Sequence, residues 1–108
     1  MNRKLTGLLG LSRRAGRMTT GYDAVAALVA AGEEVLVLLA ADLSEKTEKE
    51  LRFVIGEKPV AVRRLPLNKA EIADALGLQK PIGVCAVGDK GFAAAIEKQC
   101  RHDLEEEE

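Results

Sequence analysis

The spacing of apolar residues predicts five helices. Leu5, Leu8 and Leu9 recur at the interval that places side chains on one face of a helix, and Leu11 extends the same face. The same spacing returns four times further along the chain. We therefore expect helices over residues 3–15, 20–31, 44–55, 68–76 and 89–99.

Residues that begin and end helices stand at the ends of these segments. Four of the segments are followed directly by a glycine, as a left-handed C-terminal cap requires, namely Gly16, Gly32, Gly56 and Gly77. The expected N-caps are Thr20, Ser44, Asn68 and Asp89. Thr20 with Asp23, and Asn68 with Glu71, have the spacing of a capping box.

Two further segments, Val35–Ala41 and Ile82–Val87, are apolar on both faces and predict buried strands. A strand that does not alternate is one that is covered on both sides. Shorter strands are expected over residues 17–19 and 59–63. Because helices and strands alternate, we expect one α/β domain whose small sheet lies between helices on both faces.

Length and composition fit a single soluble domain. The 108 residues are 47% apolar and 31% charged, and two cysteines are too few for a disulfide scaffold. No apolar run approaches the length of a membrane span, and the N-terminal pattern is not that of a signal peptide. We expect one domain over residues 1–100 and an acidic tail over 101–108, in the cytoplasm.

Charge is distributed unevenly, although the net charge is −1. Residues 1–22 contain five basic residues and no acidic one, whereas residues 101–108 contain one basic and five acidic residues. Arg13, Arg14 and Arg17 gather around Gly16. A basic end favours a face that binds a polyanion, although a plain solvated surface has the same pattern.

The sequence contains no recognisable catalytic or metal-binding motif. His102 is the single histidine, and the two cysteines lack the spacing of a metal or redox site. We therefore predict no catalytic residue, no metal and no cofactor. Cys85 lies in an apolar strand and is expected in the core, whereas Cys100 is expected to be partly exposed.

Asp42 leaves two interpretations open. It follows a buried strand, where α/β proteins place ligand-binding or phosphoryl-accepting groups. The alternative is that Asp42 organises the turn into the helix over residues 44–55.

Three features together predict an RNA interface. The arginines beside Gly16 offer phosphate contacts, and the helix that starts after Thr20 offers backbone N–H groups. A loop from Gly77 to Pro81 adds a turn, an apolar tip and one cation. Since aromatic residues are scarce, recognition of the shape and backbone of a structured RNA is favoured over stacking on a single strand. The predicted RNA-binding residues are Arg13, Arg14, Arg17, Thr20, Gly21, Tyr22, Asp23, Gly77, Leu78, Gln79 and Lys80.

The order of several motifs resembles one protein family. Leu8–Arg17, then Gly21, then Val35–Asp42 and the segment Gly91–Ala93 are similar to the YlxQ-like bacterial branch of the L-seven-Ae/L-thirty-e superfamily of ribosomal proteins. The resemblance covers residues 4–99. It implies a three-layer α-β-α sandwich with a mixed four-stranded sheet. It also implies binding to a kink-turn, a sharply bent RNA duplex with tandem sheared G·A pairs.

The chain departs from the family pattern at the start of the second helix. There the family has Gly-x-Asn-Glu-x-x-x-Lys, in which Asn and Glu read guanine edges and Lys supports them. Here the glycine matches as Gly21, Asp23 stands at or beside the Asn-Glu pair, and Ala24 replaces its partner. The expected lysine is Ala27 or Leu28, depending on the alignment. The prediction is a non-enzymatic RNA-binding protein, with ribosome association also open. The alternative is a protein-interaction adaptor on the same fold that no longer reads kink-turns.

Overall fold

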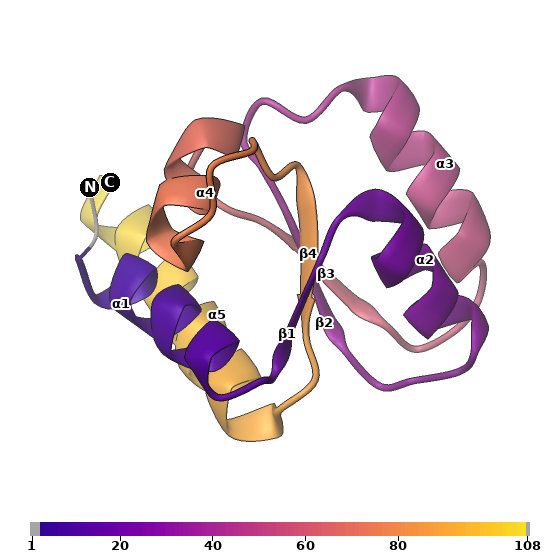
Figure 1. Ribbon diagram of the computed structural model, residues 1–108, viewed down its shortest axis with the longest axis horizontal. Coiled ribbons are helices and arrows are strands. Elements are labelled where there is room, and N and C mark those ends of the chain that lie inside the picture. Colours follow the sequence, from indigo (N-terminus) through magenta and orange to yellow (C-terminus); the bar gives the residue numbers. More distant parts are fainter. Residues whose placement is uncertain (1–2, 108) are drawn as a thin grey trace.

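The computed structural model describes the backbone of residues 3–107 and the side chains of residues 3–101 (Figure 1). Helices and strands alternate along the described chain. Their bounds are α1 Arg3–Arg14, β1 Met18–Thr20, α2 Tyr22–Ala30, β2 Leu36–Leu39, α3 Glu45–Ile55, β3 Ala61–Arg64, α4 Lys69–Leu76, β4 Val84–Val87 and α5 Lys90–Glu107. The segment predicted as an acidic tail thus continues α5 as far as Glu107.

The four strands form one mixed sheet in the order β1-β4-β2-β3. β4 runs antiparallel to both β1 and β2, and β2 runs parallel to β3. The two strands predicted to be apolar on both faces, β2 and β4, are central and buried at every residue. The strands β1 and β3 form the two edges.

Helices cover both faces of the sheet, which confirms the predicted three-layer α-β-α sandwich. Figure 1 shows α1, α4 and α5 on one side of the sheet and α2 with α3 on the other. Alternate residues of β2 serve the two layers: Leu36 and Leu38 join the core of the first layer, Val37 and Leu39 that of the second. The sheet therefore separates two apolar cores, because successive side chains of a strand point to opposite faces.

Element ends and one helix face differ from prediction. β1 begins one residue later than expected, and β3 lies at Ala61–Arg64 rather than residues 59–63. Leu11, predicted on the apolar face of α1, is 49% exposed.

The four glycines predicted to end helices all have positive φ.

Candidate nucleic-acid interface

One edge of the sheet brings together three of the segments that sequence analysis singled out. Thr20 pairs with Cys85, and Leu39 pairs with Val84 and Arg64. The carboxyl ends of β1, β2 and β3 and the start of β4 therefore meet at this edge, which we call the carboxyl edge. The start of α2, the turn between β2 and α3, and the α4–β4 loop lie along it (Figure 1).

The start of α2 follows β1 without an intervening loop. Gly21 is the N-cap, with φ 95° and ψ 147°, and its N–H donates to the carbonyl of Val84 at 2.8 Å. Among the described side chains none caps the helix, so the N–H groups of its first turn have no side-chain acceptor there. Asp23 and Ala24 are exposed there, while Tyr22 is half-buried against the core of the α2–α3 layer.

The prediction that Thr20 caps this helix is wrong. Thr20 is the last residue of β1 and is held in the sheet by its pairing with Cys85. The chain turns from strand to helix at the next residue, through a positive φ that only glycine adopts without strain. The capping-box spacing of Thr20 and Asp23 therefore has no structural counterpart.

Asp42 organises the turn before α3, as one of the two interpretations has it, through a contact with the start of α4. Its Oδ1 accepts a hydrogen bond from the backbone N–H of Lys69, the first residue of α4, at 2.9 Å. The cap of α3 is Ser44, whose hydroxyl accepts from the N–H of Thr47. Asp42 thus ties the β2–α3 turn to the start of α4.

Within the described residues, no group of three or more histidine, cysteine or acidic side chains is placed to hold a metal.

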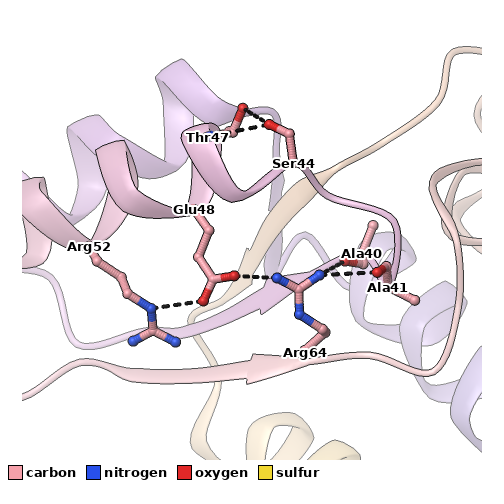
Figure 2. A network of polar contacts seen from close by, with 7 residues as sticks. All are labelled: Ala40, Ala41, Ser44, Thr47, Glu48, Arg52 and Arg64. Carbon is pink, nitrogen blue, oxygen red and sulfur yellow. Dashed lines mark hydrogen bonds and ion pairs between the residues drawn. The ribbon is translucent and has the colours of Figure 1, made fainter.

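Arg64 holds the same turn from the other side (Figure 2). Its Nη1 donates to the carbonyls of Ala40 at 2.8 Å and Ala41 at 3.1 Å, and its Nη2 pairs with the carboxylate of Glu48. Glu48 also accepts from Nε of Arg52 at 2.9 Å. The hydrogen bonds from Arg52 and Arg64 lower the pKa of Glu48 below its usual 4.5. The turn is thereby fixed at the carboxyl edge by a charged network.

The α4–β4 loop begins with a tight reversal. Gly77 has φ 74°, and hydrogen bonds from Gly77 N–H to Asp74 O and from Leu78 N–H to Ala73 O close a Schellman motif. Leu78 was predicted as an apolar tip, but it is half-buried against the core of the α1–α4–α5 layer. Gln79 and Lys80 are exposed. The loop therefore presents an amide and a cation to solvent.

The three arginines near Gly16 are exposed but do not form one cluster. The Nη1 of Arg13 lies 3.9 Å from the position of a Cβ built on Gly77, so Arg13 borders the α4–β4 loop. Arg14 instead lines a groove between α1 and α4. Arg17 lies at the opposite edge of the sheet, where its carbonyl accepts from Gly88 N–H at 3.0 Å. Only Arg13 joins the segments of the carboxyl edge.

Two basic residues at this edge, Arg64 and Lys69, were not predicted from the sequence. Lys69 is half-buried, and its Cε lies 3.6 Å from a Cβ built on Gly83 at the end of the α4–β4 loop. The capping box at Asn68 was a usable signal, because it places Lys69 at the first helical position of α4. Nothing local marks Arg64, whose carbonyl partners lie 23 and 24 residues away in sequence.

The remaining reactive groups are buried or lie outside the described side chains. Cys85 is fully buried, and burial raises the pKa of its thiol to about 12. Cys100 is also buried, which corrects the prediction of partial exposure, because α5 turns it toward the core of the α1–α4–α5 layer. His102 lies outside the residues whose side chains are described.

In the part of the chain that is described, no helix is long and apolar enough to cross a membrane.

Two solved structures have the same architecture. A protein with unknown function from Bacillus halodurans C is 29% identical, with a TM-score of 0.82 over 93% of this chain and 99% of the other. The Giardia lamblia 15.5kD RNA binding protein is 19% identical, with a TM-score of 0.69 over 94% of this chain and 92% of its own. At that level of identity the second match speaks for the fold alone.

Sequence comparison agrees with the fold. An Enterococcus faecium protein named RNA-binding protein YlxQ is 33% identical over 90 residues, which cover 83% of this chain and 84% of the relative. Residues 3–97 match the pattern of the Ribosomal protein L7Ae/L30e/S12e/Gadd45 family. The resemblance of the motifs from Leu8 to Ala93 is thereby confirmed, and the chain belongs to this family.

Proposed function

We propose that this protein binds structured RNA at the carboxyl edge of its sheet and acts without catalysis, in the cytoplasm. The observation that carries the proposal is the uncapped start of α2, where Gly21 N–H donates to Val84, the residue that follows the α4–β4 loop. Backbone N–H groups and the positive end of a helix dipole are suited to phosphate oxygens and base-edge acceptors. The relative from Enterococcus faecium, which is named as an RNA-binding protein, supports the same conclusion.

We assign the residues of this surface the following roles. The carboxylate of Asp23, which stands at or beside the Asn-Glu pair of the family motif, accepts hydrogen bonds from a base edge. Gln79 contacts an unstacked base, while Lys80 and Arg13 contact phosphates. Arg14 and Arg17 face other parts of the molecule and have no role in this surface.

The target we propose is a bent RNA of the kink-turn kind. A helix start and a loop end that meet at one edge of the sheet match a backbone that changes direction sharply better than they match a straight duplex. Ala24 and Ala27 remove two polar contacts of the family pattern and are exposed on α2. Discrimination between RNAs therefore depends on Asp23 and on the shape of the backbone.

The test is a fluorescence anisotropy titration of a kink-turn RNA and a straight duplex of equal length, at several salt concentrations. We expect preference for the kink-turn, and a fall of log affinity with log salt of about two for two phosphate contacts. Asp23→Ala should reduce the preference about tenfold, as the loss of a base-edge contact does. Lys80→Ala should weaken binding to both RNAs alike, whereas Lys90→Ala, at the opposite edge, serves as the control.

The adaptor function is the second candidate, and exposed Ala24 and Ala27 favour it. An uncharged helix face is suited to contact with another protein more than to contact with phosphates. Absence of binding to either RNA, with the fold intact by circular dichroism, would reject the RNA proposal and favour this alternative. Equal, salt-sensitive binding to both RNAs would reject kink-turn recognition only.

A further inference from the structure

The groove between α1 and α4 has walls of opposite charge. Its volume is about 320 Å³, and it lies on the layer opposite to α2 and α3. Arg3 and Arg14 stand on the α1 wall, and Glu71 and Asp74 stand on the α4 wall. Among the described side chains, no ion pair within 4.0 Å joins these two walls. Arg3, Arg14 and Asp74 are therefore available to a partner, whereas Glu71 accepts from Asn68 N–H in the capping box of α4.

The floor of the groove is made of small residues, and one of them has no explanation within a single molecule. At Gly10 a Cβ would lie 3.0 Å from the carbonyl of Ala75, so close packing of α1 on α4 requires glycine there. At Gly7 a Cβ would meet nothing within 4 Å. Glycine inside an exposed helix is destabilising relative to alanine, so Gly7 suggests that another surface approaches α1 closely.

An exposed apolar side chain accompanies the groove. Leu11 is one of two large apolar residues that are exposed among the described side chains, at 49%. It lies four residues after Gly7 and three before Arg14 on α1, which places all three on neighbouring positions of the helix surface. The outer face of α1 thus offers an apolar contact between charged ones.

We propose that a second copy of this chain docks on the α1–α4 groove, with α1 of each copy over α4 of the other. A two-fold interface uses the same patch on both subunits, so it needs a patch that is complementary to itself. This groove meets that condition, because Arg14 of one copy faces Asp74 of the other twice. An RNA is the less suitable occupant, since Glu71 and Asp74 repel phosphates along one wall.

The proposed dimer leaves the carboxyl edge of the sheet accessible at the start of α2. That helix lies in the other layer, whereas Arg13 and the α4–β4 loop lie next to the helices of the proposed interface. The ion pairs lie at the surface, and salt screens such pairs. We therefore expect the dimer to dissociate as the salt concentration rises.

The experiment is sedimentation equilibrium of the full chain over a broad concentration range, with charge-reversal variants. Arg14→Glu and Asp74→Arg should each weaken self-association about tenfold or more, because each homodimer then contains two like-charge contacts. An equal mixture of the two variants should associate again, since each contact then joins opposite charges. Both residues are exposed, so we expect the variants to fold, and circular dichroism and thermal melting check this.

Three outcomes would overturn the proposal. The first is a monomeric wild-type protein at every concentration. The second is a dimer that neither variant weakens, or that the mixture does not restore, because its interface then lies elsewhere. The third is an Arg14→Glu variant that loses RNA affinity with unchanged sedimentation, which would assign the groove to RNA. Gly7→Leu, which places a bulky side chain in the groove without touching the monomer's core, should weaken the dimer independently of charge.

Discussion

The helices α2 and α4 begin at the same edge of the sheet, yet the surroundings of their first N–H groups differ. At α4, Asn68 Oδ1 accepts from Glu71 N–H at 2.8 Å and Glu71 Oε1 accepts from Asn68 N–H at 2.9 Å, a complete capping box. Asp42 occupies the N–H of Lys69 as well. At α2 none of the described side chains accepts from the first turn.

The two helix starts therefore differ in whether their first N–H groups are hydrogen-bonded within the protein or are available to a ligand. The donors at the start of α4 are used within the protein, and the carboxylates that use them give that end negative charge. The start of α2 is held through its backbone only, by the hydrogen bond from Gly21 to Val84. An open helix start tolerates exposure because water serves its N–H groups until a ligand replaces it.

The largest effect on the free energy of unfolding is expected at the start of α2, which is held by the backbone alone. Gly21 has φ 95° and ψ 147°, so Gly21→Ala should cost about 1–3 kcal/mol of the free energy of unfolding. Urea denaturation measures this cost. The control is Gly88→Ala, at the opposite edge, where a Cβ meets nothing within 4 Å. Equal stability of the two variants would contradict the strain at Gly21.

A smaller change in the free energy of unfolding should distinguish the two predicted capping boxes, at Asn68 and at Thr20. Asn68→Ala removes an observed cap and should cost about 1 kcal/mol of the free energy of unfolding. Thr20→Val keeps the branched shape that suits a strand and removes only the hydroxyl, so its cost should stay below about 0.5 kcal/mol. Thermal unfolding of both variants decides the comparison. A cost at Thr20 as large as that at Asn68 would mean that Thr20 does cap α2.

The smallest effect is the pH dependence of the free energy of unfolding that arises from Glu48, in the network that fixes the β2–α3 turn. The pKa of Glu48 is lowered in the folded protein, so its contribution is present above pH 4.5 and is lost as the pH falls through the folded pKa. The contribution should be less than about 1 kcal/mol, since the pairs are near the surface. Glu48→Gln should flatten the stability profile below pH 4.5. An unchanged profile would show that the network does not stabilise the fold.

Sequence patterns predicted the elements whose contacts are local or whose burial is complete. The capping box at Asn68 joins residues three apart, and β2 and β4 are apolar at every position. Thr20 has equivalent spacing, but pairing with Cys85 across the sheet takes precedence, and no local pattern encodes that pairing.

The candidate site was less predictable because side-chain direction decides it. Neighbouring residues of a helix diverge by about 100° around its axis, so Arg13 reaches Gly77 while Arg14 turns to the α1–α4 groove. Arg64 acts on carbonyls that the chain brings near only after β2 and β3 have paired. Such roles require the fold to be known.

The two buried cysteines make it possible to measure local opening of the structure in this protein. Cys85 and Cys100 both belong to the core of the α1–α4–α5 layer, and the α2–α3 layer has none in the described chain. Both thiols are buried, and burial raises the pKa of Cys85, so they react with an alkylating reagent only when the surrounding structure opens. The rate of alkylation under native conditions therefore reports the opening of one layer, with no engineered probe.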